Sequence, residues 1–191
     1  MLEKSKDRKI VLLSGSPRRQ QILREAGFTF DVQKTDVSED FPSSLPVKEV
    51  AEYLARKKAD FIKSRLGSEI AIAADTTVVL GNEILNKPAD RDDAMKMLEK
   101  LSGKTHTVIT GVCIVSSEKE ISFSDHTQVS FRSLTREEIS WYIDHFKPYD
   151  KAGAYGVQEW IGMVAIDRIV GSYFNVVGLP VHRVYEELVN W

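Results

Sequence analysis

The alternation of short apolar runs with helix-forming segments is the feature of this sequence that most restricts its fold. The run at residues 10–13 passes through a Ser-Gly-Ser-Pro turn at 14–17 into a helix of about ten residues, which Gly27 ends. Strands and helices then alternate in mixed order as far as the C-terminus. The pattern predicts an α/β fold with a mixed, twisted central sheet and flanking helices.

Hydrophobic periodicity and the usual start and stop signals place the remaining elements. Further strands are expected at residues 28–33, 70–74 with a continuation to 80, 83–85, 105–115 and 121–131. Further helices are expected at residues 47–66, at 91–101, from a capping box at Thr135 to 146, and from Pro180 onward. Because no repeat, low-complexity tract or long linker interrupts them, residues 1–191 are expected to form a single domain.

The charge balance restricts the partners of the chain. Lys and Arg number 26 and Asp and Glu number 28, which gives a formal net charge of −2. A chain this close to neutral lacks the long-range field of a non-specific nucleic-acid or membrane binder. We therefore expect no stable nucleic-acid partner and no membrane partner, and any anionic ligand would be held by local cations.

The single cysteine and the N-terminus indicate the compartment. Cys113 lies in an apolar run at residues 112–115, which favours a buried bystander over a reactive thiol. Such sparse cysteine usage is typical of a reducing cytosol. The charged N-terminus is followed by an apolar stretch too short for a signal peptide or a membrane span. The expected location is cytoplasmic.

The first strand-to-helix turn is a candidate anion site. Ser16 is a natural N-cap and Pro17 a natural first helical residue, so the free N–H groups and the helix dipole would attract an anion. Arg18 and Arg19 on the same turn add donors for a phosphate. The alternative is a capped surface helix with two solvated arginines.

A lysine interrupts the apolar face of the helix expected at residues 47–66. At about 100° per residue, Lys58 falls within the apolar stripe, one turn from both Leu54 and Ile62, whereas Lys63 points away. A lysine in that position either snorkels to solvent or reaches carboxylates or phosphate in a cleft.

Three further residues are candidates for the same chemistry. The apolar run 70–74 delivers Asp75 to the end of a buried strand, where open α/β sheets bind ligands, although a turn-forming aspartate would look the same. Glu39 lies in an acidic loop and Lys87 precedes Pro88, and neither residue by itself indicates a function. The four histidines are scattered and no Gly-x-Ser-x-Gly elbow is present, so the cations and carboxylates best suit a Mg²⁺-dependent reaction on a polyphosphate.

The chain resembles the Maf family of nucleoside triphosphate pyrophosphatases over nearly its whole length. The motifs that carry this resemblance are Ser14-Gly15-Ser16-Pro17-Arg18-Arg19, Leu54-Ala55-Arg56-Lys57-Lys58-Ala59, Ala74-Asp75-Thr76, Leu85-Asn86-Lys87-Pro88, residues 101–106, residues 150–158 and Val177-Gly178-Leu179-Pro180. The resemblance implies two α/β lobes around a cleft, similar to the inosine triphosphatases. It also implies cleavage between the α and β phosphates with a divalent cation, Mg²⁺ or else Mn²⁺ or Co²⁺.

The resemblance assigns roles on the base side of the substrate. It implies that Asp75 is the catalytic carboxylate and proton acceptor, and that Arg18, Thr76 and Gln158 set base specificity. The motifs are similar to those of the branch that acts on dTTP and UTP, and sometimes on CTP and modified pyrimidine nucleotides. The family often has glycine after the glutamine, whereas Glu159 follows it here.

The resemblance also assigns the phosphate side. Ser14, Arg19, Lys58 and Lys87 match phosphate-side residues, the two lysines acting in catalysis. Glu39 matches the loop glutamate and would bind the metal together with Asp75, although the acidic neighbours of Glu39 at positions 36 and 40 are alternatives. A homodimer is a family expectation. The alternative function is a non-catalytic nucleotide- or nucleic-acid-binding regulator of cell division.

Overall fold

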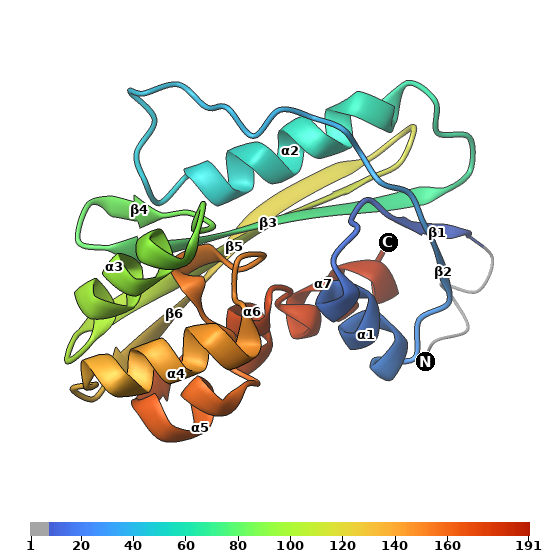
Figure 1. Cartoon of the computed structure of the whole chain (residues 1–191). Coiled ribbons are helices and arrows are strands. Elements are labelled where there is room, and N and C mark those ends of the chain that lie inside the picture. Colours follow the sequence, from blue (N-terminus) through green and yellow to red (C-terminus); the bar gives the residue numbers. More distant parts are fainter. Residues whose placement is uncertain (1–7) are drawn as a thin grey trace. The chain divides into compact units, whose positions relative to one another are not determined.

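The computed structural model describes residues 8–191 and contains strands and helices in mixed order, as the sequence pattern predicts (Figure 1). In chain order the elements are β1 (Ile10–Leu12), α1 (Pro17–Glu25), β2 (Phe30–Val32), α2 (Val50–Lys63), β3 (Ile70–Leu80), β4 (Glu83–Leu85), α3 (Arg91–Leu101), β5 (Thr105–Val115), β6 (Glu120–Phe131), α4 (Arg136–Phe146), a 3-10 turn η1 (Ala152–Ala154), α5 (Trp160–Ala165), β7 (Ile166–Val170), α6 (Tyr173–Val177) and α7 (Val181–Val189).

The strands form one mixed sheet. They are hydrogen-bonded in the order β2-β1-β3-β5-β6-β7, and β4 pairs with β3. Strand β1 runs parallel to both β2 and β3, with Leu12 opposite Val32 and Ile72. Strands β4 and β7 are antiparallel to their neighbours β3 and β6. The predicted α/β class with a mixed sheet is therefore confirmed.

The described chain divides into two compact units, with divisions within β3, β5 and β6 and a further one after α6. The first unit contains the described residues up to Asp75, together with Thr110–Asp125 and Gly178–Trp191. The second unit contains Thr76–Ile109 and His126–Val177.

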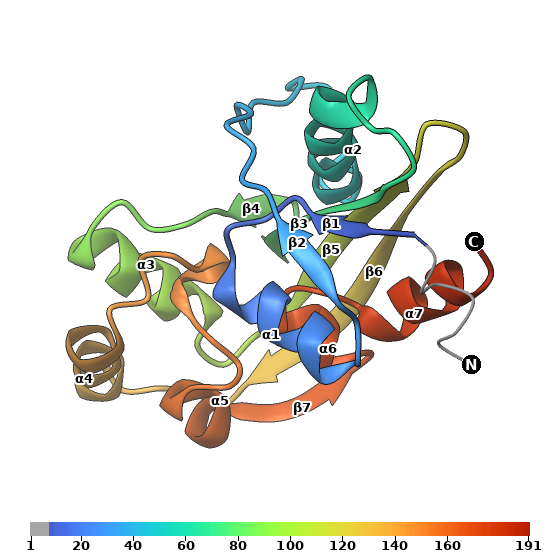
Figure 2. The same cartoon turned by 90° about the vertical axis from the view of Figure 1, so that its right-hand side faces the viewer.

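In the first unit, α2 covers one face of the strands, and α1 and α7 lie on the opposite face (Figure 2). The core under α2 is made of small and branched side chains, namely Leu13, Ala55, Ala59, Ile62, Ala71, Ala73, Cys113 and Val115. Burial raises the pKa of the Cys113 thiol to about 12, so the thiol stays protonated and unreactive. The predicted buried bystander is confirmed.

A close backbone contact sets the distance between α2 and β5. A Cβ on Gly111 of β5 would lie 2.2 Å from the backbone nitrogen of Glu52 and 2.3 Å from the carbonyl of Ala51. Only glycine therefore allows the first turn of α2 to approach the strand this closely.

Helix α2 is shorter than the predicted span of residues 47–66. Residues 47–49 form a turn in which the Glu49 N–H donates to the Pro46 carbonyl, so the helix begins only at Val50. At the other end, the Arg65 N–H donates to the Ile62 carbonyl, and such tighter bonds end the α-helical pattern at Lys63.

In the second unit, α3 and α4 pack over an apolar core that includes Leu98, Tyr142 and Ile143. The predicted helices at 91–101 and from Thr135 to 146 are confirmed, and the capping box between Thr135 and Glu138 is formed in both directions. The sequence analysis missed α5, β7 and α6, which span six, five and five residues. Among residues 8–191, no helix is long and apolar enough to cross a membrane.

Replacement of Gly111 by alanine tests the close contact with α2. Gly111→Ala should lower the free energy of unfolding by about 3 kcal/mol, because the added methyl group meets rigid backbone. The matched control is Gly67→Ala, whose Cβ would meet only a flexible Glu69 carboxylate at 3.3 Å, and it should change stability by less than about 0.5 kcal/mol. Urea unfolding of both variants measures this, and equal stabilities would contradict the close-contact account.

His106 should make the stability of the protein depend on pH. Its Nε2 lies 2.7 Å from the Tyr155 hydroxyl, and burial lowers the pKa of His106 from 6.5 to about 4. The unfolded chain therefore binds more protons than the folded chain between these values, so the contribution of His106 is lost as the pH falls from about 6.5 to about 4.

The loss should reach about 3 kcal/mol relative to a His106→Gln variant, which cannot titrate there. Urea unfolding at pH 7, 5.5 and 4 measures the difference. The exposed His145→Gln variant controls for the removal of a histidine, and parallel pH curves for wild type and His106→Gln would contradict the prediction.

Candidate active site

The N-terminus of α1 is built as the sequence predicts. Ser16 adopts an extended backbone and its hydroxyl accepts the Arg19 N–H at 3.5 Å, while Pro17 occupies the first helical position. Ser14 is buried directly before the turn, and its hydroxyl accepts the Ser16 N–H at 3.2 Å. The first turn therefore presents a capped helix N-terminus with a favourable field for an anion.

Arg19 is an integral part of this site. Its Nε donates to the Gly178 carbonyl at 2.8 Å, and its Nη1 donates to the Ala74 carbonyl at 2.9 Å and lies 3.3 Å from the Ser14 hydroxyl. Burial lowers the pKa of Arg19, and the negative charge of Asp75 opposes that shift. The alternative of a solvated surface arginine is thus wrong for Arg19, which ties α1 to the residue before Asp75. Arg18 is half-buried on the same turn.

Asp75 lies in the middle of β3, so the predicted continuation of the strand to residue 80 is confirmed and the placement of Asp75 at a strand end is wrong. Strand β3 continues to Leu80, because the β-branched residues after Asp75 favour a strand and the end of β3 pairs with β4. The neighbouring strand β1 stops at Leu12, opposite Ile72. Asp75 therefore lies beyond the end of β1.

Lys58 joins the two carboxylates that the sequence singled out. Its Nζ lies 2.5 Å from Asp75 Oδ1 and 2.9 Å from Glu39 Oε1. The side chains of Lys58 and Asp75 are each 12% exposed, whereas that of Glu39 is 53% exposed. The lysine therefore does not snorkel to solvent, and the alternative in which it reaches carboxylates is confirmed.

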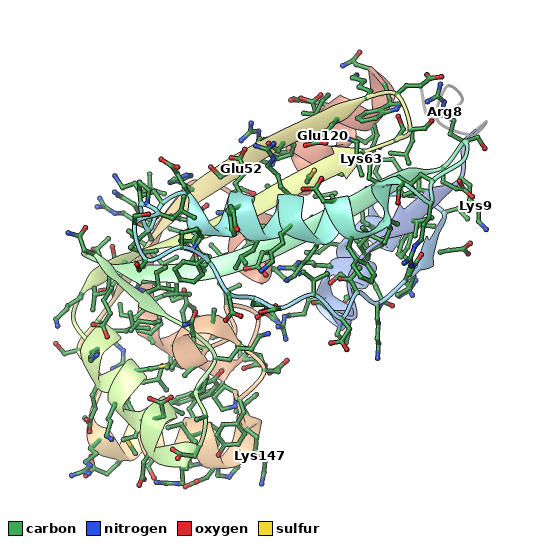
Figure 3. All side chains as sticks on the ribbon, turned by 90° about the horizontal axis from the view of Figure 1, so that it is seen from above. Arg8, Lys9, Glu52, Lys63, Glu120 and Lys147 are labelled. Atoms are coloured by element: carbon green, nitrogen blue, oxygen red, sulfur yellow. The ribbon has the colours of Figure 1, made fainter. Side chains whose placement is uncertain are left out.

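Lys63, on the same helix, has a different environment. It extends to Glu120, 2.5 Å away, and the two lie side by side in Figure 3. Its side chain is 43% exposed, in agreement with the prediction that it points away from the apolar face.

The acidic loop before α2 is held by two consecutive lysines. Lys58 binds Glu39, and Lys57 Nζ donates to the Asp40 carbonyl at 2.9 Å. The Asp40 carboxylate accepts the Ser38 hydroxyl within the loop. Of the loop carboxylates, Glu39 is thus the one that meets Lys58. The sequence reading missed Lys57, because its partner is a backbone carbonyl that no side-chain pattern reveals.

The donor set of this cluster fits a divalent cation that arrives with a phosphate ligand. Asp75 and Glu39 bind the same ammonium group, and Mg²⁺ is commonly held by one or two carboxylates plus substrate phosphates. Among residues 8–191, no group of three or more His, Cys, Asp or Glu side chains is arranged to hold a metal. Oxygens of the ligand would have to complete the coordination.

The structure brings together five of the residues predicted for the site, all in the first unit: Ser14, Arg19, Glu39, Lys58 and Asp75. The other candidates, Thr76, Lys87 and Gln158, belong to the second unit. Thr76 is half-buried in β3, Lys87 is exposed before α3, and Gln158 is exposed in the turn before α5.

Removal of the ammonium group of Lys58 tests the ion cluster. Lys58→Met leaves the buried Asp75 carboxylate without its partner and should lower the free energy of unfolding by about 3 kcal/mol. The double variant Lys58→Met/Asp75→Asn should recover most of this loss, because it removes the unpaired charge.

The matched control is Lys63→Met on the same helix, which breaks the partly exposed ion pair with Glu120 and should lower stability far less than Lys58→Met. Urea unfolding measures all four proteins. Equal effects of Lys58→Met and Lys63→Met, or no recovery in the double variant, would show that Lys58 does not neutralise Asp75.

A family model described as Maf-like protein matches residues 9–191. A dTTP/UTP pyrophosphatase of Flavobacterium psychrophilum is 48% identical over 189 residues, which cover 98% of this chain and 97% of that protein. A dTTP/UTP pyrophosphatase of Porphyromonas gingivalis is 47% identical over 192 residues, with 98% and 96% coverage.

A solved structure is similar in fold. The Ham1 protein of Staphylococcus aureus superposes with a TM-score of 0.50 at 15% sequence identity, over 65% of this chain and 72% of that one. At this identity the similarity concerns the fold alone.

Proposed function

Because this chain belongs to the Maf family, we propose that it is a pyrophosphatase that hydrolyses dTTP and UTP to the nucleoside monophosphate and pyrophosphate. CTP and modified pyrimidine nucleotides are further candidate substrates. The observation that carries the proposal is the cluster in which Lys58 holds Asp75 and Glu39 beside the N-terminus of α1.

The reaction is a substitution at the α-phosphorus. The oxygen of a water molecule forms a bond to that phosphorus, and the bond to the oxygen that bridges the α and β phosphates breaks. Asp75 accepts a proton from the attacking water, and the bridging oxygen leaves with pyrophosphate. Lys58 supports this role because its ammonium fixes Asp75 Oδ1 in place at 2.5 Å.

Local cations would neutralise the phosphate chain. The helix N-terminus with Ser14 and Arg19 supplies N–H donors on one side, and Lys58 supplies an ammonium within the same unit. The family resemblance adds Lys87 to the phosphate side. Such an arrangement suits a chain of net charge −2, which has no long-range positive field to attract a triphosphate.

A divalent cation, Mg²⁺ or else Mn²⁺ or Co²⁺, would be held by Asp75 and Glu39 together with phosphate oxygens. When bound, it would neutralise charge on the phosphoryl oxygens. Lys58 contacts both of these carboxylates, and this shared contact supports their assignment to one site.

The base of the nucleotide would be read by Arg18, Thr76 and Gln158, the positions to which the family resemblance assigns specificity. Arg18 follows the N-cap and first residue of α1, and Thr76 directly follows the proposed base Asp75 in β3.

Substitution of Asp75 tests the proposed proton acceptor. Asp75→Asn should lower turnover of dTTP at least about a hundredfold, because the amide cannot accept the proton. Asp60→Asn, an exposed carboxylate on α2, is the matched control and should turn over dTTP as the wild type does. Pyrophosphate release measures both, and near wild-type turnover by Asp75→Asn would refute the assignment.

A nucleotide panel tests the function itself. With Mg²⁺ and dTTP, UTP, CTP, GTP or 7-methyl-GTP, we expect pyrophosphate chiefly from dTTP and UTP, and none after removal of divalent metal with EDTA. No release from any nucleotide with Mg²⁺, Mn²⁺ or Co²⁺ would contradict the proposal. Tight, strongly salt-dependent binding to DNA or RNA would then favour the non-catalytic regulator.

A further inference from the structure

A buried polar network in the second unit surrounds the turn that carries Gln158. The Tyr142 hydroxyl of α4 accepts the Gly156 N–H at 3.1 Å and donates to Glu159 Oε2. The other carboxylate oxygen of Glu159, Oε1, lies 3.0 Å from Lys151 Nζ. One tyrosine hydroxyl thus contacts both ends of the segment from Gly156 to Glu159.

The backbone of this segment forms a closed turn. The Glu159 N–H donates to the Gly156 carbonyl at 3.0 Å, which places Gln158 at the third of four turn positions. The Glu159 carbonyl accepts the Gly162 N–H at 3.0 Å, and α5 starts at Trp160. Gln158 is therefore anchored through the backbone to the first turn of α5.

Two glycines allow their neighbours to pack closely against the turn. A Cβ on Gly162 would lie 1.8 Å from the Val157 carbonyl oxygen, so α5 packs directly against the turn. A Cβ on Gly156 would lie 2.8 Å from Glu159 Cδ, so the carboxylate packs directly on the backbone of Gly156. The turn is confined from both sides while the Gln158 side chain is exposed.

The network is largely buried and carries charge. The side chains of Lys151 and Glu159 are 10% and 17% exposed, and Tyr142 is fully buried. Lys151 Nζ also lies 2.7 Å from Asp150 Oδ1. Burial raises the pKa of Tyr142, so the hydroxyl stays protonated and donates to Glu159.

A buried ion pair contributes little net stability, because desolvation of the two charges offsets their attraction. Its clearest effect is to fix one geometry, since two charge-assisted bonds hold the carboxylate in a single orientation. Here the network fixes the conformation of the turn that contains Gln158.

We infer that Glu159, together with Tyr142 and Lys151, is a positioning residue that orients Gln158 for recognition of the pyrimidine base. The inference rests on the proposed function, in which Gln158 contacts the base. It also explains why a charged residue is accommodated directly after the glutamine, where the family often has glycine: the carboxylate faces Lys151 and Tyr142.

A double-mutant cycle tests whether Glu159 acts through Gln158. The four proteins are wild type, Glu159→Gln, Gln158→Ala and the double variant, and kcat and KM are measured for pyrophosphate release from dTTP and UTP. Glu159→Gln should lower kcat/KM about tenfold, chiefly through KM, because base positioning and not proton transfer is lost. In the Gln158→Ala background the same substitution should change kcat/KM less than twofold.

Matched variants separate positioning from a general structural effect. Asp144→Asn removes a carboxylate from the same helix as Tyr142, where it pairs with Arg91, and should leave kcat and KM unchanged. Tyr142→Phe removes only the hydroxyl and should reproduce the Glu159→Gln effect, and it replaces Glu159→Gln in the cycle if that variant does not fold.

The outcomes are distinct. If Glu159→Gln or Tyr142→Phe lowers kcat/KM by the same factor with and without Gln158, the network does not act through Gln158 and the inference is overturned. Wild-type-like KM for both variants overturns it as well. Absence of pyrophosphate release from the wild type would instead refute the proposed function, and the inference with it.

Discussion

The ion pair between Lys58 and Asp75 is the interaction on which the candidate site depends. It requires a lysine on the apolar face of α2, and the helix reaches the strands closely enough only because Gly111 has no side chain. The same ammonium binds Glu39, and Lys57 holds the neighbouring backbone, so the acidic loop is attached to α2 as well. A single helix position therefore organises a strand residue and a loop residue around one charge.

Charge is balanced locally in the first unit. Two carboxylates share one lysine, and Arg19 satisfies the carbonyls of Ala74 and Gly178 while it lies at a helix N-terminus. Under the proposed function, a triphosphate with its metal would enter a site where positive and negative groups are already held in place. Electrostatic preorganisation of this kind lowers the cost of reorganisation during reaction.

The second unit restrains its candidate residue in a different way. The turn before α5 is restrained by a buried network and by two glycines that leave no free space, while Gln158 remains exposed. The proposed catalytic groups in the first unit are thus fixed by ion pairs, and the proposed specificity residue is fixed through its backbone. The first solution restrains side chains and the second restrains the backbone that carries one, in both cases before a ligand binds.

The sequence by itself determined the local features: the capped N-terminus of α1, the capping box of α4, the bounds of α3 and β5, and the inward direction of Lys58. These depend on residues within a few positions of one another. Tertiary structure alone decided that Glu39 is the loop carboxylate that meets Lys58, that Asp75 pairs with Lys58, and that Glu159 meets Tyr142. Contacts of this kind join residues that are far apart in the sequence. Lys58 and Asp75 are 17 positions apart, and Arg19 and Gly178 are 159 positions apart. Only packing of the chain brings them together.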